Sequence, residues 1–242
     1  MSLKQAEILG VNVNSLTMVQ AVEKVQQFID ERKNALVATA NAEMLMRATQ
    51  DEELKHILNS ADLVVPDGAG TVWAANYLGV EMPERVAGYD LAQELMREAP
   101  GRGDRIYFFG SAPGVAESAR EKAMELYPGI KIVGTRNGFF SEADEPEIIA
   151  EIKAARPDIL LVALGVPKQE KWLYKCRQAL QVPVAIGVGG TLDVMAGVMQ
   201  RAPLWMQKAK LEWLFRGLKQ PSRAGRLLAL PKFVMKVMAS KK

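Results

Sequence analysis

Several groups that often organise small proteins are scarce in this chain of 242 residues. It has one cysteine, Cys176, and one histidine, His56, so neither a disulfide framework nor a Cys/His metal cluster is expected within it. No apolar run approaches the roughly 18 residues of a membrane-spanning helix. Met1–Glu7 lacks the apolar core of a secretory signal. These absences predict a cytosolic location.

Negative charge is nearly missing from the C-terminal part of the chain. Residues 201–242 hold eleven lysines and arginines but a single acid, Glu212, which gives a net charge of +10. Because the whole chain carries +3, residues 1–200 carry −7. This asymmetry predicts a segment that meets a polyanion, either a membrane surface or a nucleic acid.

Short apolar runs alternate with amphipathic stretches along the first 200 residues. Most runs lack a polar/apolar alternation, which is typical of strands buried on both faces of a sheet. The runs are Ala35–Ala40, Leu63–Val65, Arg105–Phe109, Ile130–Gly134, Ile159–Leu164 and Val182–Val188. Helical patterns lie between them, at Met18–Ile29, Val115–Leu126, Glu147–Ala155 and Gln169–Leu180. The alternation predicts an α/β fold with a doubly wound, mainly parallel sheet and helices on both faces.

The pattern changes after Gly197, where basic helical segments are interrupted by Pro203, Pro221 and Pro231. We therefore expect a core of residues 1–200 and a basic helical appendage of residues 201–242. Since all six predicted strands precede this boundary, a chain without the appendage is expected to keep a folded core.

Ligands of open α/β sheets bind beyond the carboxyl ends of the strands, so the residues after each apolar run are the first candidates for a site. Thr39 and Asn41 end the first run, where both can hydrogen-bond a sugar or a phosphate. Asn41 can equally cap the helix that follows it. Asp67 comes after the second run and is either a helix cap or a general base.

Two glycine turns follow later runs. Gly110 and Ser111 open a helix, where free backbone N–H groups favour an anion. The dinucleotide fingerprint G-x-G-x-x-G is absent there, because Ala112 and Glu117 occupy its later glycine positions. Gly189 and Gly190 follow the last run in the same way. Both turns are candidates for contact with a phosphate or a nucleotide.

Two further side chains have polar or charged groups suited to the same ligand. Gln169 lies near the start of a predicted helix. Three alternatives are open for it: contact with a uracil, contact with a sugar, or no contact with a ligand. Arg85 lies between predicted helices in an organised turn with Gly88 and Asp90. It is either a surface charge or a bidentate partner of a diphosphate.

In kind and in order, these motifs resemble those of the WecG/TagA/CpsF glycosyltransferases, and most of all the TagA branch. The similarity spans nearly the whole chain, and the ordered set is far more specific than any single motif. The motifs are Thr39-x-Asn41, Pro66-Asp67-Gly68, Arg85-x-x-Gly88-x-Asp90, Gly110-Ser111, Leu164-Gly165-x-Pro167-Lys168-Gln169-Glu170, Gly187-x-Gly189-Gly190, Arg201-Ala202-Pro203-x-Trp205, Gly217-Leu218, Pro221-x-Arg223 and Arg226.

The resemblance implies an inverting transferase with a Rossmann-like core and no metal or other cofactor, and the sequence contains no D-x-D. It makes Asp67 the general base for the acceptor hydroxyl. Thr39, Asn41 and Gln169 would position the sugars. The diphosphate charge would be met by backbone N–H groups and by Arg85, Arg216, Arg223 and Arg226.

The resemblance also implies the substrates. The TagA branch moves N-acetylmannosamine from its UDP-sugar to N-acetylglucosamine on undecaprenyl diphosphate, which makes the linkage unit of wall teichoic acid. Other branches use the uronic acid of that sugar, or glucose, so the donor stays open. The lipid acceptor predicts peripheral association with the inner face of the bacterial membrane. An apolar face of the appendage, formed by Leu211, Leu214, Phe215 and Leu218, suits this contact.

Two rival interpretations fit less well. A Rossmann-type oxidoreductase lacks its glycine fingerprint here. A nucleic-acid-binding module would use a less apolar arm to follow phosphates, so no nucleic-acid partner is expected. Self-association into a homo-oligomer is left open.

Overall fold

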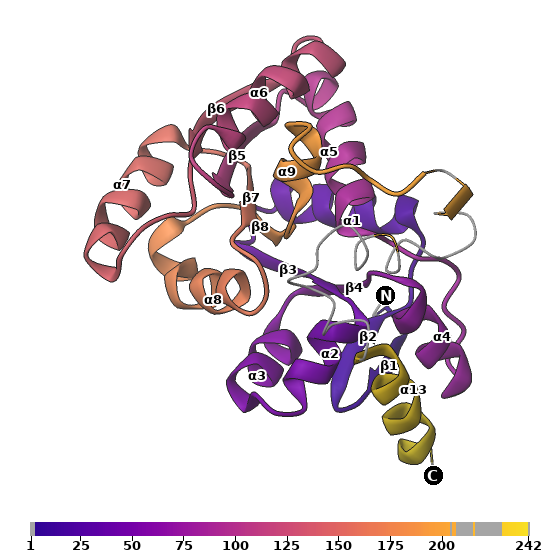
Figure 1. Ribbon diagram of the computed structural model, residues 1–242. Coiled ribbons are helices and arrows are strands. Elements are labelled where there is room, and N and C mark those ends of the chain that lie inside the picture. The colour runs from indigo at the N-terminus through magenta and orange to yellow at the C-terminus, as the bar shows by residue number, and fades with distance from the viewer. Residues whose placement is uncertain (1–2, 204, 207–214, 216–228, 242) are drawn as a thin grey trace.

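The computed structural model describes residues 3–203, 205–206, 215 and 229–241 (Figure 1). Its centre is one sheet of six strands, and every pair of neighbouring strands is parallel. The strands are β3 (Ala35–Ala40), β4 (Leu63–Pro66), β5 (Arg105–Gly110), β6 (Lys131–Arg136), β7 (Ile159–Ala163) and β8 (Val184–Gly187). Their order across the sheet is β4-β3-β8-β7-β5-β6. All six predicted strands, and the predicted fold class, are confirmed.

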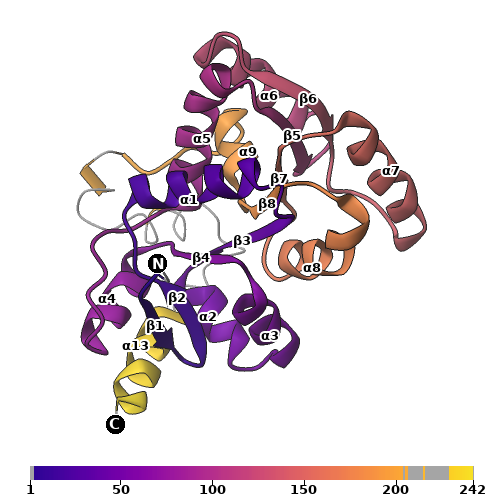
Figure 2. The same cartoon turned by 180° about the vertical axis from the view of Figure 1, so that it is seen from behind.

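Helices connect the strands and cover the sheet on both faces (Figures 1 and 2). They are α1 (Met18–Asp30), α2 (Ala42–Ala48), α3 (Glu52–Ser60), α4 (Ala69–Tyr77), α5 (Gly88–Arg102), α6 (Val115–Leu126), α7 (Glu145–Ala155), α8 (Lys168–Leu180), α9 (Thr191–Met195) and α13 (Ala229–Ser240). A short 3-10 turn, η1 (Glu142–Asp144), precedes α7. The antiparallel strands β1 (Gln5–Ile8) and β2 (Val11–Asn14) form a separate hairpin.

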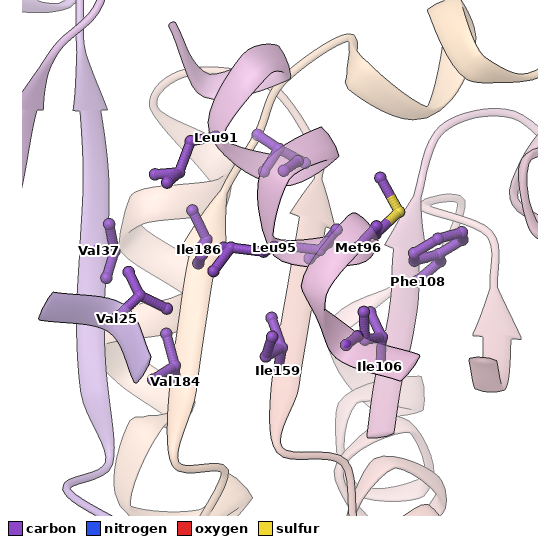
Figure 3. Packing of buried hydrophobic residues seen from close by; sticks show 14 of the residues in the cluster. Val25, Val37, Leu91, Leu95, Met96, Ile106, Phe108, Ile159, Val184 and Ile186 are labelled. Atoms are coloured by element: carbon purple, nitrogen blue, oxygen red, sulfur yellow. The ribbon is translucent and has the colours of Figure 1, made fainter. Parts of the chain in front are cut away.

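Alternate residues of each strand face opposite layers, which explains why the runs are apolar throughout. One face packs beneath α1, α5, α6 and α9, and Figure 3 shows Val37, Ile159 and Ile186 of the strands meeting Leu91 and Leu95 of α5. Neighbouring strand residues turn the other way and form two clusters. At the β3–β4 end, Ala38 and Val64 pack on the hairpin, α2, α3 and α4, while at the other end Leu160 packs on α7 and α8.

The β1–β2 hairpin was not predicted from the sequence. Its apolar side chains, such as Val11 and Val13, are fully buried, and it lies against the edge strand β4. The side-chain oxygen of Asn14 accepts a hydrogen bond from the N–H of Val64 at 2.8 Å. The hairpin thus covers a backbone donor of an edge strand that would otherwise invite pairing with another chain.

The last helix, α13, is docked on the core. Phe233 and Val237 have no exposed surface and belong to the same cluster as the residues of α2 and α4. Lys236 adds a hydrogen bond from its Nζ to Thr49 Oγ1 at 2.8 Å. A boundary at residue 200 therefore cuts through this cluster, and removal of the whole appendage takes the buried side chains of Phe233 and Val237 from the core.

Replacing Phe233 with alanine is expected to lower the free energy of unfolding by about 3–5 kcal/mol, since it empties a fully buried aromatic site. Met235 of the same helix is 63% exposed, so Met235→Ala should change the stability by less than about 0.5 kcal/mol. Urea denaturation of the full chain measures both values. Equal, small effects of the two substitutions would mean that α13 does not dock in solution.

Candidate active site

The candidate residues predicted after the strands of the core lie at one edge of the sheet. Because the six strands are parallel, their carboxyl ends open on the same side, and the loops after them converge there. The residues gathered at this edge are Thr39 and Asn41 after β3, Asp67 after β4, Gly110 and Ser111 after β5, Gln169 after β7, and Gly189 and Gly190 after β8.

The middle of this edge is a topological switch point, the usual location of a ligand crevice in open α/β sheets. The helix after β3, α2, packs on one face of the sheet, whereas the helix after β8, α9, packs on the other. The segments that follow β3 and β8 therefore leave the sheet toward opposite faces at the boundary between these two strands. At that boundary the hydroxyl of Thr39, a residue only 5% exposed, donates a hydrogen bond to the carbonyl oxygen of Gly187 at 2.9 Å.

Asn41 caps helix α2. Its side-chain oxygen accepts a hydrogen bond from the N–H of Met44 at 3.0 Å, so the alternative raised by the sequence is confirmed. The cap fixes the side chain at the carboxyl edge. Whether it also contacts a sugar stays a prediction.

Asp67 is held rigidly by its backbone. Its N–H donates to Ala40 O at 2.9 Å, and its carbonyl accepts from the hydroxyl of the fully buried Thr71 at 3.2 Å. Thr71 also donates to Ala40 O, at 3.0 Å. The N-cap residue of α4 is Gly68, which adopts a φ of 92° and, as a glycine, has no side chain to cap the helix. The half-buried Asp67 is thus not the cap of this helix, and it stands at the strand end that the base hypothesis requires.

Gln169 is buried, with 1% of its surface exposed. Its Oε1 accepts hydrogen bonds from two backbone N–H groups, that of Gly165 at 3.2 Å and that of Gly189 at 3.1 Å. Its Nε2 donates to Glu170 Oε1 at 2.7 Å. The side chain therefore joins the loops after two neighbouring strands, β7 and β8. A direct contact between Gln169 and a sugar stays a prediction.

Glu170 is the most deeply buried acid at this edge, with 1% of its surface exposed. Burial, only partly opposed by the hydrogen bond from Gln169, raises the pKa of its carboxyl group from 4.5 to about 7. Sequence reasoning gave Glu170 no role of its own. Its spacing of three residues from the buried Leu173 places it near the apolar side of α8, and this was the available signal.

The glycine turn after β5 is shaped by close packing. A Cβ at Gly110, whose φ is 129°, would come within 2.4 Å of Ala163 O, so the position requires glycine. The next residue, Ser111, donates from Oγ to Asp193 Oδ2 of α9 at 3.1 Å. The turns after β5 and β8 are thus connected through α9.

Arg85 lies beside a carboxylate that is shared with the start of the appendage. Asp90, in the first turn of α5, accepts two bonds from Arg201, at 2.6 and 2.8 Å, and lies 3.4 Å from Arg85 Nη2. The Arg201 guanidinium also lies over the Tyr89 ring, 4.6 Å from its centroid. The bidentate pair joins the first residue of the appendage to the predicted diphosphate-binding loop.

The remaining predicted cations, Arg216, Arg223 and Arg226, lie outside the described residues, as does most of the predicted apolar face. Trp205 of the appendage is described and is 64% exposed. Across the described ranges, no three side chains of His, Cys, Asp or Glu are grouped in a way that could hold a metal ion.

The burial of Glu170 predicts a pH-dependent stability. The folded state keeps the proton up to about pH 7, whereas the unfolded chain releases it near 4.5. The contribution of this group to stability is therefore full below about pH 4.5 and is lost as the pH rises through 7. Between pH 5 and 8, wild type should lose on the order of 2–3 kcal/mol relative to Glu170→Gln, measured by urea denaturation. Parallel pH profiles of the two proteins would contradict the raised pKa.

Comparison with known proteins identifies the family. Residues 6–242 match the sequence model of a family described as the glycosyl transferase WecG/TagA/CpsF family. A relative from Bacillus spizizenii is 37% identical over 211 residues, which cover 87% of this chain and 81% of that protein. One from Bacillus subtilis is 34% identical over 232 residues, covering 96% and 89%. One from Staphylococcus aureus is 32% identical over 240 residues, covering 98% and 94%.

Each of the three relatives is named N-acetylglucosaminyldiphosphoundecaprenol N-acetyl-beta-D-mannosaminyltransferase. The family match spans the sheet, the carboxyl-edge loops and the appendage alike, and it confirms the resemblance carried by the ordered motifs. The chain belongs to the glycosyl transferase WecG/TagA/CpsF family.

Proposed function

We propose that this glycosyltransferase moves N-acetylmannosamine from UDP-N-acetylmannosamine to N-acetylglucosamine on undecaprenyl diphosphate, forming a β-1,4 linkage. This step builds the linkage unit of wall teichoic acid. The name shared by relatives that are 32–37% identical over most of the chain supports the substrates. The observation that carries the proposal is the convergence of Asp67, the glycine turns and Arg85 at the carboxyl edge of the sheet. Arg85 is placed there by its neighbour Val86, whose N–H donates to the carbonyl oxygen of Pro66 at the end of β4 at 2.9 Å.

Asp67 is the proposed general base. The acceptor hydroxyl oxygen attacks the anomeric carbon from the side opposite UDP, and its proton passes to the Asp67 carboxylate. The bond from the anomeric carbon to the phosphate oxygen breaks, and UDP leaves with the bonding electrons. One base and one stabilised leaving group are sufficient for this displacement, which inverts the configuration. A residue in this role needs a fixed backbone, and the bonds to Ala40 and Thr71 support that.

The leaving diphosphate needs positive charge. Arg85 at the carboxyl edge supplies one guanidinium, and we assign Arg216, Arg223 and Arg226 of the appendage to the same task. The glycine turns at Gly110–Ser111 and Gly189–Gly190 complete the set with backbone N–H groups other than those of Ser111 and Gly189, which already donate to Ala163 O and Gln169 Oε1. Thr39, Asn41 and Gln169 position the sugars, either by contact or through the loops that they hold.

The acceptor determines where the enzyme works. An undecaprenyl chain cannot leave the bilayer, so the enzyme has to reach the lipid headgroup. None of the helices in the described ranges combines the length and apolar character needed to cross a membrane. We propose peripheral binding to the inner face of the cell membrane through the appendage, whose net charge of +10 suits an anionic leaflet.

The proposed reaction is tested with the full chain, UDP-N-acetylmannosamine and a water-soluble GlcNAc-diphospho-lipid analogue. We expect wild type to release UDP and to form a β-linked product, identified by mass spectrometry and NMR. Asp67→Asn should be slower by on the order of a hundredfold or more, because an amide cannot take the proton. Its UDP affinity should be nearly unchanged, since the amide preserves the shape of the side chain.

Asp30→Asn is the matched control for the base. Asp30 is a 63% exposed carboxylate at the C-terminal end of α1, and the variant should keep the wild-type rate. Wild-type turnover by Asp67→Asn across the pH range would exclude Asp67 as the base. Product from another UDP-sugar, but none from UDP-N-acetylmannosamine, would overturn the proposed donor.

Transfer should survive EDTA. The sequence has no D-x-D, and the proposal gives the diphosphate charge to arginines and backbone N–H groups. The rates with EDTA and with added magnesium or manganese are expected to agree within about twofold. A strict requirement for either metal would contradict this and would make carboxylates such as Asp193 candidate ligands.

A further inference from the structure

The loops after β7 and β8 are joined by one carboxamide, and the orientation of that group is fixed by chemistry. The N–H groups of Gly165 and Gly189 are both donors, so only the oxygen of the Gln169 side chain can accept from them. The nitrogen then points the other way and needs an acceptor of its own. That acceptor is Glu170 Oε1, at 2.7 Å.

Burying the carboxyl group of Glu170 at this position costs folding free energy. A carboxyl group that is 99% buried loses its hydration, and no charged neighbour is among the causes of its raised pKa. Its second oxygen, Oε2, is buried without a hydrogen-bond partner in the described part of the chain. A leucine of similar size would fill the site without this penalty, so folding alone gives no reason for the acid.

The end of β8 is built around this pair. A Cβ at Gly187 would lie 2.6 Å from Gln169 Nε2 and 3.1 Å from Glu170 Oε1. The bond between the two side chains therefore occupies the space that a side chain at Gly187 would need. The carbonyl oxygen of Gly187 in turn accepts a hydrogen bond from the hydroxyl of Thr39. The pair thus lies directly beside the switch point of the sheet.

We propose that Glu170 is a positioning residue, which fixes the Gln169 carboxamide and through it the spacing of the Gly165 and Gly189 loops that bind the nucleotide-sugar. This inference rests on the proposed function for the ligand of those loops. Without an acceptor at position 170, Gln169 Nε2 loses its bond to Glu170, and the carboxamide is held only through its oxygen. The side chain then moves more freely, the spacing of the Gly165 and Gly189 loops varies, and the site loses its preorganised form.

The test compares Glu170→Leu with Glu170→Gln in the full chain. Leucine removes the acceptor, so we expect the Kd for UDP and the KM for UDP-N-acetylmannosamine to rise about five- to tenfold, the loss of one net hydrogen bond. The Tm should change little, because the unpaired buried Oε2 is removed while the buried Gln169 Nε2 loses its acceptor. Glutamine keeps an accepting oxygen and should bind UDP within about twofold of wild type.

Three results would overturn the proposal. Wild-type UDP binding by the leucine variant would show that the bond is dispensable. Parallel losses of Tm and affinity in that variant would reduce Glu170 to a core residue. An equal loss in the glutamine variant would mean that the charge matters and the acceptor does not.

Amide hydrogen exchange separates this proposal from the proposed function. In Glu170→Leu, the N–H groups of Gly165 and Gly189 should exchange at least about tenfold faster, while those of distant strands stay unchanged, a readout that needs no ligand. If wild type fails to bind UDP, the proposed function is wrong, and the exchange rates still decide the role of Glu170. Unchanged exchange at both glycines would overturn the positioning role.

Discussion

The parallel arrangement of the six strands is the constraint from which the rest of the structure follows. Neighbouring parallel strands cannot be joined by tight hairpins, so each connection must cross a face of the sheet, usually as a helix. Both faces are then buried, and every strand has to be apolar on both sides. The carboxyl ends of all six strands lie on one side of the sheet, and the polar candidate residues are in the loops on that side.

At that edge, polar side chains hold the loops to one another. Thr39 bonds β3 to the end of β8, Gln169 bonds the loops after β7 and β8, and Ser111 bonds the turn after β5 to α9. A phosphate that binds backbone N–H groups needs them at fixed positions before it arrives. Such bonds preorganise the turns, so substitution of these residues can reduce activity even where the side chain never meets a substrate.

Much of this could be predicted from the sequence, and the rest could not for identifiable reasons. Uninterrupted apolar runs are specific to strands buried on both faces, so the strands and the edge that carries Asp67 and Gly110 were placed correctly. The hydrogen bonds of Gln169 and Glu170 depend on how closely the loops after β7 and β8 approach each other in space. The spacing of residues along the sequence does not determine that distance. The docking of Phe233 depends on a groove built by α2 and α4, so the appendage appeared more separate from the core than it is. The hairpin strands mix polar and apolar residues over only four positions each, so they lack the uninterrupted apolar run that revealed the equally short β4 and β8.

Charge connects the appendage to the same edge. Asp90 holds Arg201 in a bidentate pair while it neighbours Arg85, so the first residue of the appendage and a predicted diphosphate ligand share one carboxylate. At the far end of the chain, α13 returns to α2 and α4, which follow the strands that carry Asn41 and Asp67. The appendage is therefore held to the core at its start, through Arg201, and at its end, through α13.

The most direct test of this account is the location of bound UDP, determined from a crystal structure of the full chain with the nucleotide. We expect the diphosphate to lie beyond the carboxyl ends of β5, β7 and β8, against the turns at Ser111 and Gly189. A groove of about 490 Å³ between α1 and α5, lined by Met18, Val22 and Glu94 among others, lies on the helical layer. UDP bound there, with the carboxyl edge unchanged, would contradict the account.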